Sequence, residues 1–174
     1  ASDVYKRQNQ ACIVGKIKEI CYLCYPILIH GYMPRIKDGF KGERAIVLPA
    51  FLIEELKQDP LGSELYITDI GYYPHAYFHY RKRDTEEVTE FILIYCMEGE
   101  GWFELDKHQY AVTANQFFIL PEHQAHAYGS NEENPWTIYW IHFNGTKAAF
   151  FSAGFDRPKS ITPQEDSRIK DCLL

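Results

Sequence analysis

Residues 90 to 129 place the strongest constraint on the fold of this chain. Their sequence is EFILIYCMEGEGWFELDKHQYAVTANQFFILPEHQAHAYG, in which short apolar runs are separated by a Gly-x-Gly turn, a polar corner and a proline. Apolar runs of this length, separated at short intervals by turn residues, are typical of a small antiparallel β-barrel or sandwich. The segment therefore predicts a mainly β domain.

The same pattern continues on both sides of this segment. The predicted strands are Tyr66 to Tyr73, Ala76 to Lys82, Phe91 to Glu98, Gly101 to Leu105, His108 to Val112, Gln116 to Leu120, Ala125 to Tyr128 and Trp136 to Phe143. A short helix is predicted at Phe51 to Lys57, because Asp59-Pro60 follows it as a stop signal. Further helices are predicted at Thr146 to Phe155 and from Gln164 onward, and the end of the chain truncates the second one.

The chain divides into three expected parts. Its 174 residues suffice for one domain with a proper core and are short for two. Residues 1–32 mix Lys and Cys with apolar runs of no clear period and precede Met33, so we expect a non-native or disordered leader there. The barrel is expected at 33–145, and a helical region begins at 146–174. The apolar run 20–29 is about half of what crosses a bilayer, so no membrane span is predicted.

Charge and cysteine usage narrow the partners and the compartment. The formal net charge is −6 and no dense stripe of Lys and Arg occurs. Because phosphate binding depends on clustered cations, we expect no nucleic-acid binding by the barrel itself. Five scattered cysteines, an odd number, indicate a reducing compartment, the cytoplasm, and no disulfide framework. The C-x-x-C spacing at Cys21 and Cys24 lacks a second ligand pair and indicates no zinc centre.

From about Ile46 to about Asn144, the order of strands and turns resembles the cupin barrel, in particular the sensor domain of AraC-type transcription regulators. One motif is Tyr95-x-x-x-Gly99, and a second, Pro121 to His126, matches P-x-G-x-x-H with His123 in place of the glycine. The resemblance implies a cupin-like (jelly-roll or double-stranded β-helix) barrel that binds a small-molecule effector, often a sugar. It also implies a homodimer formed by helices after the barrel. DNA would be bound only through a C-terminal helix-turn-helix domain that is missing from this chain.

The metal ligands that the cupin resemblance would imply are mostly missing. In metal-binding cupins, a His-x-His pair and a Glu precede the turn at Gly99, and one more His follows the proline of the second motif. The Glu position falls at Ile92, the paired histidines fall among residues 85–88, and only His126 matches. A lone imidazole does not make a closed or catalytic metal site. We therefore expect neither a metal nor another cofactor.

The resemblance also implies a set of ligand-binding residues. Arg83 matches the family arginine, whose guanidinium could hold sugar hydroxyls or a carboxylate, although a solvated turn is an equally good interpretation. Alternation along the last strand puts Ile138, Trp140 and His142 on one face, and the pocket tryptophan of the family falls at Trp140. The candidate set is Arg83, Tyr95, His126, Tyr128, Ile138, Trp140 and His142, with His79 and Tyr77 as weaker candidates.

The favoured hypothesis is the effector-sensing and dimerisation domain of a cytoplasmic AraC-type regulator, and two alternatives stay open. A stand-alone cupin enzyme, such as a dioxygenase or isomerase, is disfavoured because metal ligands are missing. The sequence contains no recognisable set of a nucleophile, a base and an orienting group, so no catalytic residue is predicted. A non-catalytic carbohydrate-binding module is the other alternative, and sequence beyond Leu174 would distinguish it.

We expect residues 1–32 to be dispensable, because they lack the periodicity that lets a segment bury itself against a barrel. A chain that starts at Met33 should melt at the same temperature as the full chain, as measured by scanning calorimetry. A markedly lower melting temperature would mean that the leader is part of the native fold.

Overall fold

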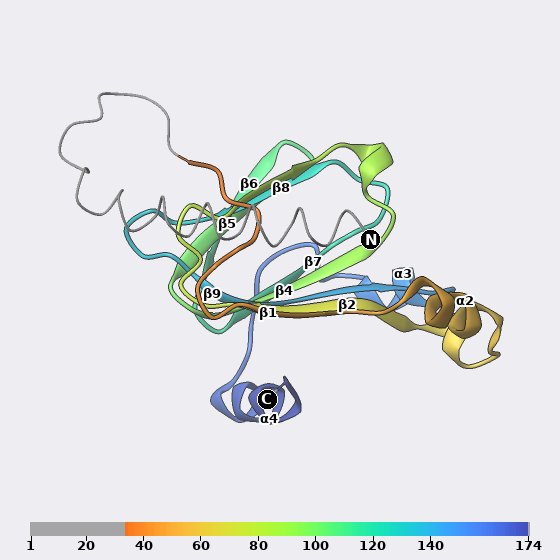
Figure 1. Ribbon diagram of the computed structural model, residues 1–174. Coiled ribbons are helices and arrows are strands. Elements are labelled where there is room, and N and C mark those ends of the chain that lie inside the picture. Colours follow the sequence, from red (N-terminus) through yellow and green to blue (C-terminus); the bar gives the residue numbers. More distant parts are fainter. Residues whose placement is uncertain (1–33, 174) are drawn as a thin grey trace, which may run out of the picture. The chain divides into compact units, whose positions relative to one another are not determined.

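The computed structural model describes residues 34–173, in which two antiparallel sheets face each other (Figure 1). The six-stranded sheet has the order β1-β2-β9-β4-β7-β10 and the four-stranded sheet has the order β3-β8-β5-β6. The strands are β1 Arg44–Val47, β2 Tyr66–Tyr73, β3 Tyr80–Arg83, β4 Phe91–Glu98, β5 Glu100–Leu105, β6 His108–Thr113, β7 Gln116–Leu120, β8 His126–Ser130, β9 Thr137–Asn144 and β10 Lys159–Ser160. The prediction of a mainly β, cupin-like barrel is confirmed.

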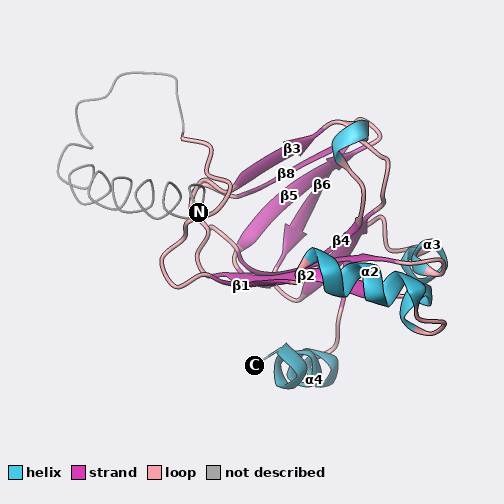
Figure 2. Cartoon of the chain, turned by 45° about the vertical axis from the view of Figure 1, so that its right-hand side comes forward, coloured by secondary structure: helices cyan, strands magenta, loops and turns pink. Residues whose placement is uncertain are grey.

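Within residues 34–173, three helices and two 3-10 turns accompany the strands. They are α2 Ala50–Gln58, α3 Ala148–Ser152, α4 Pro163–Leu173, η1 Gly62–Glu64 and η2 Thr85–Glu87. Figure 2 shows α2 and α3 near one end of the six-stranded sheet, whereas α4 lies on the side of that sheet away from the four-stranded one. As predicted, α2 stops before Asp59-Pro60: Asp59 caps the helix, and its backbone N–H donates to the carbonyls of Glu55 and Leu56. In the described part of the chain, no helix is long and apolar enough to span a membrane.

Two sequence-based boundaries are wrong for identifiable reasons. The predicted strand at 76–82 begins only at Tyr80, because His75 and Phe78 adopt positive φ angles of 40° and 58° and the chain turns there. The helix expected from Thr146 begins later, because the N–H groups of Thr146 and Lys147 donate to carbonyls in η1. The turn at 74–79 matters for the site, since it brings His79 into the space between the sheets.

A cluster of buried side chains fills most of the space between the sheets. Phe103 of β5 stacks on Phe118 of β7 with ring centroids 4.0 Å apart, so each sheet supplies one ring. Trp136 is completely buried at the start of β9, and its indole lies against Gly101, where a Cβ atom would come within 2.0 Å of the ring. Burying an aromatic side chain of this size contributes roughly 1.5–3 kcal/mol. The two sheets are therefore held together by large rings packed against small residues.

The segment after α3 returns to the outer face of the six-stranded sheet. Strand β10 pairs with β7, so residues beyond the expected barrel boundary at 145 complete this sheet. The hydroxyl of Tyr95, on β4, hydrogen bonds to the carboxylate of Asp166 in α4. The two described cysteines, Cys96 and Cys172, are free thiols, and burial raises the pKa of Cys96 to about 12. The expected leader, Met33, Cys21 and Cys24 lie outside the described residues.

Replacing Gly101 with Ala should destabilise the barrel by at least about 2 kcal/mol, because the added methyl group overlaps the Trp136 ring. Urea denaturation followed by tryptophan fluorescence measures this change. Glu104→Gln, at an exposed position of the same strand, is the control and should stay within about 0.5 kcal/mol of the parent. Equal stabilities of the two variants would mean that Trp136 can move aside.

Candidate functional site

A cavity of about 100 Å³ lies between the two sheets. Both sheets and the segment before β1 contribute to its wall. The lining residues are Lys37, Asp69, Tyr73, His79, Arg81, Arg83, Ile94, Tyr128, Ile138, Trp140 and His142. A second hollow of about 70 Å³ adjoins it and shares Arg83 and His142. Cavities of roughly 150 Å³ hold a molecule the size of benzene, so this space suits a small molecule and not a polymer.

Most of the candidate ligand-binding residues come together at this cavity. Those that line it are Arg83, Tyr128, Ile138, Trp140 and His142, joined by His79 from the weaker candidates. Tyr95 is not among the lining residues, because its neighbour Ile94 points inward and alternation turns Tyr95 toward α4. His126 does not line it either: its Nδ1 lies 3.0 Å from the Gln124 carbonyl. Tyr77 is half exposed in the turn before β3.

The register between the neighbouring strands β2 and β9 creates one face that lines the cavity. Alternating residues of β9 point inward and oppose alternating residues of β2. The opposed pairs are Ile138 with Tyr73, Trp140 with Gly71, and His142 with Asp69. Gly71 is required at its position, because a Cβ atom there would lie 2.3 Å from the Trp140 ring. The absence of a side chain at Gly71 lets the indole lie against β2 at the cavity wall.

Arg83 lies in strand β3 and not in a solvated turn. The strand pairs with β8, and Lys82 is its one exposed residue. Arg81 and Arg83 are half-buried and line the cavity, whereas Lys82 between them is exposed. The triple-cation corner that was ambiguous in the sequence thus directs two guanidinium groups toward the cavity and one ammonium group away from it.

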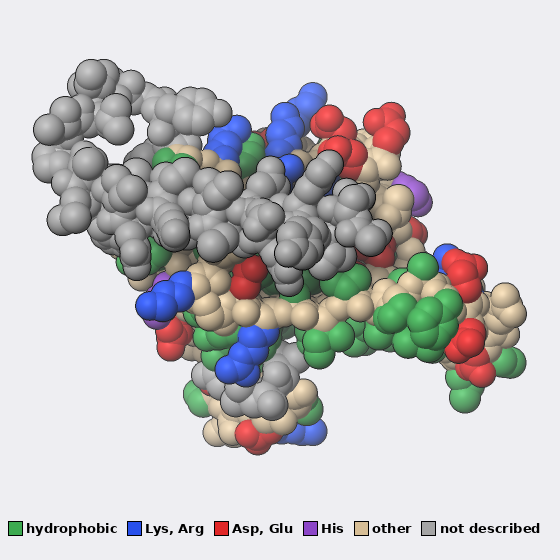
Figure 3. All heavy atoms as spheres, viewed as in Figure 1, with side chains coloured by type: hydrophobic (Ala, Val, Ile, Leu, Met, Phe, Trp, Pro, Cys, Tyr) green, Lys and Arg blue, Asp and Glu red, His purple; other side chains and the backbone are tan. Residues whose placement is uncertain are grey.

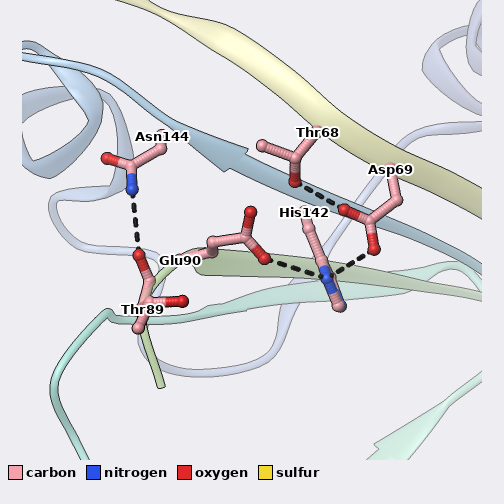
Figure 4. A network of polar contacts seen from close by, with 6 residues as sticks. All are labelled: Thr68, Asp69, Thr89, Glu90, His142 and Asn144. Atoms are coloured by element: carbon pink, nitrogen blue, oxygen red, sulfur yellow. Dashed lines mark hydrogen bonds and ion pairs between the residues drawn. The ribbon is translucent and has the colours of Figure 1, made fainter. Parts of the chain in front are cut away.

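A cluster of three charged groups lies where the cavity meets the adjoining hollow (Figure 4). His142 Nδ1 lies 3.0 Å from Asp69 Oδ2 and 3.4 Å from Glu90 Oε2. The Thr68 hydroxyl donates to the other oxygen of Asp69 at 2.5 Å and so orients this carboxylate. The strand β2 carries a β-bulge between Ile67 and Asp69, which sets Asp69 opposite His142. Sequence reasoning missed Asp69 and Glu90, because a β-bulge cannot be recognised from the alternation of apolar and polar residues.

The cluster favours the charged form of each of its members. Burial lowers the pKa of His142, but hydrogen bonds to Asp69 and Glu90 outweigh it, and the pKa is raised above 6.5. Burial raises the pKa of Asp69, but hydrogen bonds to His142 and Thr68 outweigh it and lower the pKa. The hydrogen bond from His142 is the main cause of the lowered pKa of Glu90. The arrangement is that of an imidazolium held between two carboxylates.

The same three side chains are the described residues that could together hold a metal ion. Their ligand atoms lie within 4.8 Å of one another, and two carboxylates with one imidazole suit a divalent cation. His126, which matches the cupin ligand position, does not belong to this group. Because the Nδ1 atom lies within hydrogen-bonding distance of both carboxylates, the geometry itself favours a proton at this position.

Two neutral N–H donors complete the cavity wall. The indole N–H of Trp136 donates to His79 Nδ1 at 3.1 Å, so the proton of the neutral imidazole lies on Nε2. Burial, together with the nearby charges of Arg81 and Arg83, lowers the pKa of His79 to about 3 and keeps the ring neutral. Among residues 34–173, His79 Nε2 and Trp140 Nε1 are both buried without a hydrogen-bond partner. Both residues line the cavity, so a bound molecule could accept from them.

Comparison with known proteins finds a family model that matches the part of the chain to which most of the cavity wall belongs. The family model described as the AraC-like ligand binding domain matches residues 70–174. The chain is 36% identical over 114 residues to the MmsAB operon regulatory protein of Pseudomonas aeruginosa, an alignment covering 62% of this chain and 36% of that protein. It is 31% identical over 84 residues to the lactose operon transcription activator of Staphylococcus xylosus, covering 48% and 26% of the two chains. The chain thus spans about a third or less of the length of these relatives. Among solved structures, the cupin domain of Schizosaccharomyces pombe Cnp3 is similar, with a TM-score of 0.41, 11% identity and coverage of 64% of this chain and 71% of that one.

Replacing His142 with Gln should destabilise the fold by about 1–3 kcal/mol near pH 6, because two half-buried carboxylates lose their partner. The folded-state pKa of His142 is raised, so its contribution is complete below pH 6.5 and is lost as the pH rises through the folded-state value. The difference in unfolding free energy between parent and variant should therefore shrink from pH 6 to pH 9 in urea titrations. His108→Gln, at an exposed position of β6, serves as the control for the substitution itself. A difference that grows with pH would contradict the imidazolium assignment.

Proposed function

The chain belongs to the family of AraC-like ligand-binding domains, and from this premise we propose that it is the effector-sensing and dimerisation domain of a bacterial, cytoplasmic AraC-type transcription regulator. The observation that carries the proposal is the cavity, whose wall lies almost entirely within the matched residues and combines cations, N–H donors and an indole. Under this proposal a small polar effector, of the size of a sugar or a sugar derivative, binds between the sheets. DNA is contacted only by a helix-turn-helix domain outside this chain.

Each group in the cavity wall has a distinct use in binding such a molecule. The guanidinium of Arg83 can donate two parallel hydrogen bonds to hydroxyls or to a carboxylate. The Trp140 indole can cover an apolar face of the ligand, and Ile138 beside it supplies further apolar surface. The Tyr128 hydroxyl can both donate and accept. The combination suits a compact molecule with polar groups on one side and C–H groups on another.

The homodimer is the second part of the proposal. Phe150 and Phe151 of α3 are 86% and 51% exposed, and the short helix belongs to the region 146–174 that we assign to dimerisation. Further apolar side chains are exposed on β1 and α2, where Figure 3 shows hydrophobic side chains gathered near α2. Exposed apolar surface of this kind supports contact with another protein chain. A carbohydrate-binding module that acts without DNA would share the cavity but would not need this contact.

Ligand binding, and not catalysis, is the activity that we assign to the cavity. The family is described by the binding of ligands, and the operon regulators among its relatives support a regulatory role. Among the described residues that line the cavity there is no Ser, Thr or Cys that could serve as a nucleophile beside the histidines. The proposal therefore assigns no catalytic residue.

Replacing Arg83 with Ala should weaken effector binding by roughly 1.5–3 kcal/mol, the scale of a hydrogen bond to a charged group. The fold should remain nearly as stable, because Arg83 forms no ion pair with any carboxylate of the described chain. Calorimetric titration with a panel of monosaccharides and sugar acids measures the affinity. The exposed Arg157→Ala, outside the cavity, is the matched control. If Arg83→Ala and Trp140→Ala both fold and both keep the parent affinity for a ligand that binds, the cavity is not the effector site.

A further inference from the structure

The cavity contains positive charge that the protein leaves unpaired. Lys37, Arg81 and Arg83 line it, and none of them forms an ion pair with a carboxylate in the described part of the chain. Arg81 and Arg83 are half-buried, so solvent screens their charges less than those of fully exposed residues. Burying two like charges side by side without a partner is unfavourable. Such an arrangement is stabilised when a molecule of opposite charge binds.

The acidic residues at the cavity supply only part of this compensation, through the attraction between Asp69 and Arg83. Asp69 lines the cavity and Glu90 borders the adjoining hollow, but both carboxylates contact His142 Nδ1. With His142 protonated, the cluster of three carries one net negative charge. The three cations of Lys37, Arg81 and Arg83 exceed it, so the cavity as a whole stays positive.

The uncharged polar atoms in the cavity wall also favour a ligand group that accepts hydrogen bonds. Three buried side-chain atoms of the described residues lack a hydrogen-bond partner, and two of them, His79 Nε2 and Trp140 Nε1, belong to residues that line the cavity. An indole nitrogen can only donate, and the Trp136 contact on Nδ1 makes His79 Nε2 a donor as well. Both unpartnered nitrogens therefore require an acceptor. The hydroxyls of a neutral sugar both donate and accept hydrogen bonds, whereas a carboxylate only accepts them.

We propose that the effector is a small organic carboxylate, which binds through Arg81 and Arg83 and accepts further hydrogen bonds from the N–H groups of the cavity wall. The inference rests on the proposed function, in that it takes the cavity to be the effector site. A carboxylate is favoured over inorganic phosphate, because phosphate has no C–H groups that could lie against the Trp140 indole in the cavity wall. The cavity volume of about 100 Å³ is smaller than the roughly 150 Å³ that holds benzene, so it restricts the enclosed part of the ligand to a few carbon atoms beside the carboxylate. The assignment of Arg81 to binding adds a residue that the family motif does not include.

Matched pairs of probes that differ only in the carboxylate test this inference. The pairs are L-lactate with L-lactamide and D-galacturonate with D-galactose, and inorganic phosphate is the further anion. We expect at least one carboxylate to bind about tenfold or more tightly than its neutral partner, by calorimetric titration and by the shift of the melting temperature. Phosphate should bind more weakly than that carboxylate. Raising the sodium chloride concentration should weaken carboxylate binding and leave the neutral partner unaffected.

Arg81→Gln should remove most of the preference for the carboxylate over its neutral partner. Lys82→Gln is the matched control, because it removes the same charge from the adjacent, outward-facing position of the same strand and should keep the preference. If a neutral probe binds as tightly as its carboxylate partner and depends on Trp140, the anion inference fails while the effector site stands. Tighter binding of phosphate would also overturn it, in favour of a phosphorylated ligand. If no probe binds, or if binding survives both Arg83→Ala and Trp140→Ala, the effector site itself is wrong as well.

Discussion

The packing of Trp136 against Gly101 is the contact on which the rest of the barrel depends. Trp136 directly precedes β9 of the six-stranded sheet, and its indole fills the space that Gly101 leaves open in the four-stranded sheet. It therefore sets both the distance between the two sheets and the position at which β9 begins relative to the four-stranded sheet. Every second residue beyond it, from Ile138 to His142, then faces the cavity. The hydrogen bond from the same indole to His79 also fixes which imidazole nitrogen carries the proton.

The layers of the fold and much of the site were predictable, because both follow from alternation. The apolar runs at 66–73, 91–98 and 116–120 became strands with the predicted bounds. Arg83 and Trp140 were found through the family motif, and the structure places both in the cavity wall. Arg81 was open to the same reasoning, since it shares its face of β3 with Arg83. The family motif does not include a counterpart of Arg81, so it gave no reason to add this residue to the candidate set.

What sequence reasoning missed depends on local geometry that alternation does not encode. Asp69 faces His142 because of a β-bulge, and Glu90 reaches the same histidine from just before β4. Positive φ angles in the turn before β3 shortened a predicted strand and placed His79 between the sheets. In the opposite direction, Tyr95 was assigned to the pocket from its position near the motif, although its register directs it to the other face. Turns and bulges set the positions of the polar residues of this site, whereas the alternation of residues along the strands sets the positions of the apolar ones.

Through the contact between Tyr95 and Asp166, β4 connects the cavity to α4. Ile94 touches the cavity and Tyr95, the next residue, holds α4 on the opposite face, so the wall between the interior and the C-terminal helix is a single strand thick. Consecutive residues of one strand share a planar peptide unit, so a displacement of this unit moves the backbone that carries both side chains. Any shift of β4 that accommodates a molecule inside the barrel is therefore passed to the helix outside across one peptide bond, without a long relay through the core.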